Sequence, residues 1–138
     1  MKKIILLLVM ISMNTLASEY VVIVNEKNPI SKISKNEISQ ILLVNKTDWP
    51  SGKGISIINY NYDSDAAENL FKNFAGMSAL QAKKMYLTKV FNGVIQKKPT
   101  THETTTDIIE AVAENVNAVS LIEKTEKINT TVKALTIE

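Results

Sequence analysis

The sequence predicts an α/β fold, a three-layer sandwich in which helices flank a mixed β-sheet. Two observations predict it: short apolar, β-branched runs alternate with segments whose apolar residues recur at helical spacing, and capping motifs open several of these segments. Such alternation is typical of helices packed on a sheet. No repeat, low-complexity tract or linker divides the chain, so we expect one domain over residues 18–138. The expected strands are Tyr20–Asn25, Ile55–Tyr60, Ala118–Ile122 and Thr130–Ile137.

Residues 1–17 have the three parts of a secretory signal peptide. Lys2 and Lys3 give a positive start, Ile4–Ile11 is an uninterrupted apolar run, and a more polar stretch ends at the small residue Ala17. The run is too short to cross a bilayer, which takes roughly 20 residues. We expect cleavage after Ala17 and a periplasmic or secreted protein with no membrane insertion after processing. A retained membrane anchor is the alternative.

Composition restricts the partners of the mature domain. The chain has 16 basic and 14 acidic residues, and removal of Lys2 and Lys3 leaves the mature side chains balanced. This balance argues against a nucleic-acid partner and against a basic footprint for membranes. Every basic residue is a lysine, so the guanidinium fork that grips phosphate or carboxylate is missing. The chain has no cysteine, which excludes disulfides and a lipoprotein anchor.

The first strand and the first helix are separated by a turn. Tyr20–Asn25 is apolar and β-branched, as in a buried strand, and Asn28-Pro29 breaks it. Ser34 and Glu37 have the spacing of a capping box, which predicts a helix start. The apolar stripe of this helix is Ile38, Ile41 and Leu42.

A loop rich in turn residues, 45–54, leads to the strand Ile55–Tyr60. We expect Trp49 in this loop to close the core beneath it, because Trp is highly buried on average. Stacking on a sugar or a partner is the alternative reading of Trp49.

The second helix follows the polar turn Asn61–Ser64, with Ser64 or Asp65 as its cap and Gly76 at its end. The apolar face of this helix is expected at Ala66, Ala67, Leu70, Phe71 and Phe74.

Two more helices are expected in the second half. Ser78 and Gln81 form a capping box, and Gly93 weakens or ends the helix that they open. Lys97–Glu103 is expected to be a polar loop, and Thr105 or Thr106 to cap the last helix. The third helix is expected to carry on one face the apolar residues Leu87, Val90, Phe91 and Val94. The fourth is expected to carry the apolar residues Ile108, Ile109, Val112, Ala113 and Val116.

The order and spacing of these landmarks resemble the periplasmic phosphate-binding protein family, the type II solute-binding proteins of ABC transporters, and specifically a small stand-alone subgroup with the length of one lobe. The landmarks are the strand ending at Asn25, Asn28-Pro29, the turn Trp49-Pro50-Ser51-Gly52, the loop NYDSDAA before Phe71, Tyr86, Phe91-Asn92-Gly93 and the strand that begins at Ala118. The resemblance implies a phosphate or other oxyanion ligand held by the loop before Phe71.

The departures from the family lie in that loop. The family usually offers an Arg and a Ser-Gly-Thr there, which hold phosphate at a helix N-terminus. By spacing back from Phe71, this chain has Asn61 in place of the Arg and Asp65-Ala66-Ala67 in place of Ser-Gly-Thr. A carboxylate at this position repels an anion. The Phe-x-Gly expected after the first helix is also absent.

The candidate ligand-binding residues are therefore Asn61, Ser64 and Asp65, and the alternative is an ordinary capped turn. Thr104, Thr105 and Thr106 could offer donors to an anion, but the adjacent Asp107 argues against it. The single His102 has no second histidine or cysteine to form a metal site and no marked nucleophile, so we expect no metal, no cofactor and no catalytic residue.

The sequence thus predicts an exported, non-enzymatic, solute-binding-like protein with an altered anion loop. It resembles the substrate-binding component of a phosphate ABC transporter. The alternative is an envelope interaction or assembly protein that kept the fold and lost phosphate binding.

Overall fold

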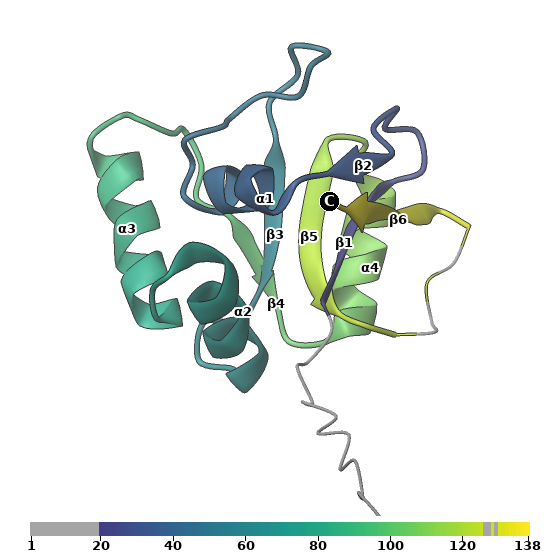
Figure 1. Cartoon of the computed structure of the whole chain (residues 1–138). Helices are drawn as coiled ribbons and strands as arrows, with labels where there is room; N and C mark the ends of the chain where they lie inside the picture. The colour runs from purple at the N-terminus through teal and green to yellow at the C-terminus, as the bar shows by residue number, and fades with distance from the viewer. Residues whose placement is uncertain (1–19, 126–127, 129) are drawn as a thin grey trace, which may run out of the picture.

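The computed structural model describes residues 20–125, 128 and 130–138, and these form one mixed six-stranded sheet with four helices (Figure 1). The expected signal peptide, residues 1–17, lies outside the described residues. The strands are β1 (Tyr20–Asn25), β2 (Lys32–Ile33), β3 (Ser56–Tyr60), β4 (Thr100–His102), β5 (Ala118–Glu123) and β6 (Val132–Ile137). The helices are α1 (Lys35–Leu42), α2 (Asp65–Ala75), α3 (Ala79–Phe91) and α4 (Thr105–Glu114).

The strand order is β2-β6-β1-β5-β3-β4. β3 pairs in parallel with both β4 and β5, and β1 pairs antiparallel with β5 and β6. Because β3, β4 and β5 run in one direction, their last residues, Tyr60, His102 and Glu123, lie at the same end of the sheet. We call this the carboxyl end of the sheet.

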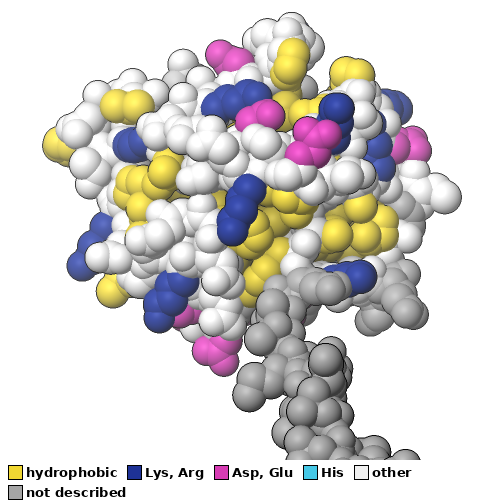
Figure 2. All heavy atoms as spheres, viewed as in Figure 1, with side chains coloured by type: hydrophobic (Ala, Val, Ile, Leu, Met, Phe, Trp, Pro, Cys, Tyr) yellow, Lys and Arg dark blue, Asp and Glu magenta, His cyan; other side chains and the backbone are white. Residues whose placement is uncertain are grey.

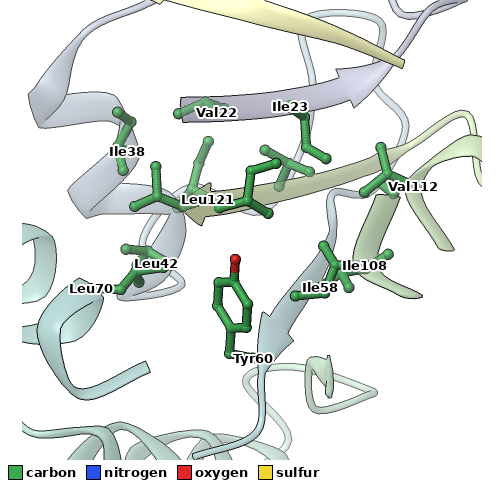
Figure 3. Close-up of a cluster of buried hydrophobic side chains, with 14 of the residues drawn as sticks. Val22, Ile23, Ile38, Leu42, Ile58, Tyr60, Leu70, Ile108, Val112 and Leu121 are labelled. Carbon is green, nitrogen blue, oxygen red and sulfur yellow. The ribbon is translucent and has the colours of Figure 1, made fainter. Parts of the chain in front are cut away.

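The sheet is the middle of three layers, as the sequence predicts. α4 contacts every strand from β6 to β4 and covers one face, while α1 and α2 lie on the other face (Figure 1). α3 packs on α2 and on the end of α1, further from the sheet. In the close-up of Figure 3, Ile38 and Leu42 of α1 and Ile108 and Val112 of α4 approach the strands from opposite sides. All four of these side chains are buried.

Many side chains that the sequence assigns to apolar faces are buried, whereas Leu87, Phe91, Val94 and Val116 are exposed. Trp49 is 4% exposed, and its indole Nε1 donates to the carbonyl oxygen of Asn117 at 2.9 Å, which ties the loop 45–54 to the segment before β5. The core reading of Trp49 is therefore confirmed. Phe71 and Tyr86 contact each other edge to face with ring centroids 6.3 Å apart, so they join α2 to α3.

The helix starts follow the predicted caps with one shift. The Ser78–Gln81 capping box is present, and the hydroxyls of Ser34 and Ser64 accept from the N–H groups of Glu37 and Ala67. The last helix is capped by Thr104, one residue before the predicted cap, because the Thr104 hydroxyl is the one that accepts from the N–H of Asp107.

Two predictions of coil are wrong. The segment expected to be a polar loop, Lys97–Glu103, contains β4, because Thr100–His102 pair in register with Ile58–Tyr60 of β3. The two residues of β2 pair in parallel with β6 and were not expected. Both strands are short and lie at the two edges of the sheet, where exposed side chains give no period-two pattern. In the part of the chain that is described, no helix is both long and apolar enough to span a membrane.

Candidate functional site at the carboxyl end of the sheet

Two helices begin at the carboxyl end of the sheet. β3 leads through the turn 61–64 into α2, and β4 leads through Glu103 and Thr104 into α4. Because β3 and β4 are adjacent and parallel, α2 and α4 both start at this end, at the lower end of the molecule in Figure 1, and they then run along opposite faces of the sheet. Ligands of open α/β sheets bind at this end of the strands. The three predicted ligand-binding residues, Asn61, Ser64 and Asp65, all lie there.

Asn61 organises the turn between β3 and α2. Its N–H donates to the carbonyl of His102 at 3.1 Å, and its Nδ2 donates to the Glu103 carboxylate at 2.7 Å. Its Oδ1 accepts from the N–H of Asp63 at 3.1 Å, an Asx turn. The Asn61 side chain therefore links the loop after β3 to the loop after β4, and both of its polar atoms already have partners within the protein.

Ser64 is the cap of α2, which settles the choice between Ser64 and Asp65. Its hydroxyl accepts from the N–H of Ala67 and donates to the carbonyl of Asn61 at 2.7 Å. Asp65 is the first residue of α2, and its side chain is exposed. The N–H groups of Asp65 and Ala66 have no acceptor within the described residues, so they are available to a solute.

The start of α4 has the same form. Thr104 caps it, and the N–H groups of Thr105 and Thr106 have no acceptor among residues 20–125, 128 and 130–138. The two helix starts thus present two pairs of backbone donors at one end of the sheet. Both also lie at the positive ends of their helix dipoles.

A buried tyrosine fixes the position of the α4 start. The hydroxyls of Tyr60 and Thr105 lie 2.7 Å apart, and the Tyr60 oxygen also accepts from the N–H of Glu123 at 3.1 Å. β3, α4 and β5 are therefore joined at a single oxygen atom. Burial raises the pKa of Tyr60, against the opposing effect of its hydrogen bonds to Thr105 and Glu123.

The charge at the carboxyl end is negative. α2 has Asp65 and Glu68 in its first turn, α4 has Asp107 in its first turn, Glu103 follows β4, and Glu123 is the last residue of β5. Glu68 is engaged by Lys72 and by the N–H of Ala79, whereas the Asp65 and Asp107 side chains are exposed. Carboxylates within a few ångströms of the free N–H groups oppose an anion and favour a neutral or cationic solute.

His102 lies at the end of β4, half-buried, and its carbonyl accepts from Asn61. Within the described part of the chain no group of three or more His, Asp or Glu side chains could hold a metal ion.

A separate hollow lies away from this end of the sheet. A surface cleft of about 700 Å³ lies at the opposite end of β3, between the loop 44–48 and the connection from α3 to β4. It is lined by Lys46, Ile55, Val94, Lys97 and Lys98 among others. None of the three predicted ligand-binding residues contributes to it.

The sequence placed Asn61 and Ser64 in the turn before α2, but it did not show their hydrogen-bond partners. Glu103 as the partner of Asn61 depends on the pairing of β3 with β4, and β4 was read as loop. Tyr60 shows in the sequence only as the last residue of an apolar strand. One sequence signal bears on the role of Tyr60. Thr105 lies at a predicted helix start, and a threonine there offers a hydroxyl as a hydrogen-bond partner.

Comparison with known proteins supports the fold. A protein from Clostridium perfringens assigned as a phosphate ABC transporter substrate-binding protein, solved with bound phosphate, superposes with a TM-score of 0.66 at 16% identity. An ABC-type phosphate transport receptor from Vibrio cholerae gives 0.57 at 15%, and PstS from Borrelia burgdorferi gives 0.62 at 13%. No protein-family model matches the chain, and no curated protein sequence does.

Each of these structures covers 86% of the chain, but the chain spans only 44%, 45% and 47% of the respective proteins. The resemblance to one lobe of a phosphate-binding protein is thus confirmed as a likeness of fold. Identities this low do not carry the ligand across.

Proposed function

We propose that the protein is an exported, non-enzymatic, solute-binding lobe whose solute is polar but carries no net negative charge. The observation that carries the proposal is that two helices start at the carboxyl end of the sheet, with free N–H groups at Asp65, Ala66, Thr105 and Thr106. These donors suit a solute with hydrogen-bond acceptors.

The carboxylates beside those donors set the charge of the solute. Asp65 begins α2, and Glu103 accepts from Asn61 in the adjoining loop. In the structurally similar Clostridium protein the bound ligand is phosphate. Two nearby carboxylates and the absence of arginine argue against that ligand here, because like charges repel and no bidentate cation offsets them.

The fold likeness supports the non-enzymatic part of the proposal, since the similar structures are substrate-binding proteins. The role of the Vibrio cholerae protein as a phosphate transport receptor, together with the sequence pattern of residues 1–17, supports export. Because the chain spans less than half of each of these proteins, a solute bound here is covered from one side unless a second lobe closes over it.

A thermal-shift panel tests the proposal. A solute that binds only the folded state raises the melting temperature as its concentration rises. We expect a shift from a member of a panel of neutral and cationic solutes, namely zwitterionic amino acids, polyols, sugars and small ammonium cations. We expect none from phosphate or sulfate at the same concentrations. A phosphate shift contradicts the assigned charge, and a flat response to every solute contradicts solute binding.

A further inference from the structure

α3 has a row of exposed apolar side chains, Leu80, Leu87, Phe91 and Val94, which we call the α3 stripe. Leu80, Leu87 and Phe91 are spaced by seven and four residues, so they lie on one face of the helix. Their exposed fractions are 57%, 47% and 91%, and Val94, just beyond the helix, is 59% exposed. Nearly complete exposure of a phenylalanine beside three exposed aliphatic residues is unusual for a free surface and marks a contact site.

The opposite face of α3 holds the helix in place. Ala79, Ala82 and Tyr86 are buried, and the Tyr86 hydroxyl donates to the carbonyl of Leu42 at 2.7 Å. Lys89 donates to the neighbouring carbonyl of Leu43. The α3 stripe therefore cannot turn inward without breaking these contacts, and it is presented outward from a fixed helix.

Lysines flank the α3 stripe, and the carboxylate that reaches its start is that of Glu68 of α2, which accepts from the N–H of Ala79 and pairs with Lys72. Residues 69–102 contain six lysines and no Asp or Glu. On the helix, Lys83 and Lys84 project on either side of Leu80 and Leu87, as their spacing requires, and Lys97 and Lys98 follow Val94. On the side of the molecule where α3 lies, hydrophobic and lysine side chains share the surface (Figure 2).

The balanced charge of the mature chain thus hides a local separation. Asp65, Glu103, Asp107 and Glu123 lie at the carboxyl end of the sheet, whereas residues 79–98, which form α3 and the connection after it, contain five lysines and no carboxylate. A surface of this kind is complementary to a partner that is both apolar and negatively charged.

The type of cation favours a lipid surface over a protein. Interfaces between proteins are depleted of lysine, whereas Lys83, Lys84, Lys97 and Lys98 flank the stripe. A lysine can lay its aliphatic stem along the acyl boundary and keep its ammonium among the headgroups. A cluster of four or more lysines on a helical surface is typical of segments that bind anionic lipid headgroups.

We propose that the α3 stripe docks the protein on an anionic phospholipid surface. α3 lies in the headgroup region, Phe91 and Val94 insert at the acyl boundary, and Lys83, Lys84, Lys97 and Lys98 contact lipid phosphates. The carboxyl end of the sheet is formed by other elements, so solute binding and membrane contact use separate surfaces.

Vesicle flotation tests the proposal on protein purified from the cells that make it, with its N-terminus determined by mass spectrometry. The vesicles contain phosphatidylglycerol and phosphatidylethanolamine in equal parts, and phosphatidylcholine vesicles serve as the neutral comparison. We expect binding to the anionic vesicles only, weakening as salt rises. Replacing Lys83 and Lys84 together by Gln should lower partitioning about 25-fold, at about fivefold for each lysine near the surface. Phe91→Ser should lower it about tenfold or more.

Matched variants exclude a general effect of charge or hydrophobicity. Lys27→Gln with Lys53→Gln removes two exposed lysines far from α3, and Val116→Ser removes an exposed apolar side chain elsewhere. Both should bind vesicles as the unmodified protein does. The proposal is overturned if the anionic vesicles are not bound at low salt, or if the matched variants lose as much binding as the α3 variants. It is also overturned if sedimentation shows a dimer that Phe91→Ser dissociates, since a second copy then covers the stripe.

Discussion

The hydroxyls of Tyr60 and Thr105 lie 2.7 Å apart at the carboxyl end of the sheet, and this contact fixes the start of α4 against β3. Because Tyr60 also accepts from the N–H of Glu123, its oxygen joins three elements. Both residues come from segments that the sequence places correctly as strand and helix, but their pairing depends on the topology of the sheet.

We expect Tyr60→Phe and Thr105→Val each to lower the free energy of unfolding by about 1–2 kcal/mol, because each leaves a polar partner less satisfied. The double variant should lose less than the sum, with a coupling energy of about 1 kcal/mol. Urea unfolding of the four proteins measures this. Thr106→Val, at the exposed neighbouring position, should change stability little. Additive losses in the double variant would show that the two hydroxyls do not interact.

Tyr86 gives the fold a pH dependence. Burial is the main cause that raises the pKa of Tyr86, followed by its proximity to Tyr62, and burial also raises the pKa of Tyr62 and of Tyr60. A group whose pKa is higher in the folded than in the unfolded chain stabilises the fold below its unfolded pKa, about 10 for tyrosine. That stabilisation is lost as pH rises through the folded pKa.

We therefore expect Tyr86→Phe to cost about 1–2 kcal/mol near neutral pH, where the hydrogen bond to the carbonyl of Leu42 is lost. This cost should shrink above about pH 10, by up to about 1.4 kcal/mol per pH unit, because only the unmodified protein carries the Tyr86 phenol in addition to Tyr60 and Tyr62. Urea unfolding of both proteins at a series of pH values measures the difference, and the lysines common to both cancel. A difference that stays constant or grows with pH would contradict the assignment.

Val44 ends α1 in a conformation that suits glycine. Its φ is 59°, in the left-handed region, and it is the one non-glycine residue with positive φ in the part of the chain that is described. Its side chain is 8% exposed. A β-branched residue in this region is strained by about 1–2 kcal/mol, which burial of the side chain offsets.

Two substitutions separate strain from burial. Val44→Ala loses most of the buried side chain and keeps a Cβ at positive φ, so we expect a loss of about 1–2 kcal/mol. Val44→Gly removes the strain as well, so it should be at least as stable as Val44→Ala, the reverse of the usual order of glycine and alanine at a helix end in ordinary conformation. Thermal and urea unfolding of the pair measure this order, and a glycine variant clearly less stable than the alanine variant would show that Val44 is unstrained.

The sequence was a good guide to buried elements and a poor one to edges and surfaces. Apolar periodicity located β1, β3, β5 and the helices because these bury a face, and hydroxyl caps located Ser64 and Ser78 because capping is local chemistry. β4 was missed because pairing with β3 is a non-local relation between polar residues. Leu87 and Phe91 were placed on one helical face, which is right, but the sequence did not show that this face points outward.

The same limit applies to charge and to the candidate site. The charges of the mature side chains sum to zero, and this sum predicts no basic footprint for membranes. A sum does not show where the charges lie, and in the fold the lysines of α3 are separate from the carboxylates at the starts of α2 and α4. Asn61 could be placed in the loop before α2 by spacing from Phe71, but its bond to Glu103 could not.

We predict that two carboxylates prevent phosphate from binding at the carboxyl end of the sheet. Asp65 and Glu103 lie beside the free N–H groups at the two helix starts. Asp65→Ser restores a hydroxyl, and Glu103→Gln removes charge while an amide oxygen can still accept from Asn61. Ala67 is 1% exposed, so a threonine there would overpack the core and is left unchanged.

We expect the double variant to gain a concentration-dependent rise in melting temperature with phosphate that the unmodified protein lacks. At a phosphate concentration 100 times Kd, binding stabilises the fold by about 2.7 kcal/mol. Asp48→Ser, which removes an exposed carboxylate at the other end of β3, should gain nothing. If the double variant folds normally and still ignores phosphate, charge is not the barrier. The free N–H groups would then be too far apart or too poorly directed to hold a tetrahedral anion without a second lobe.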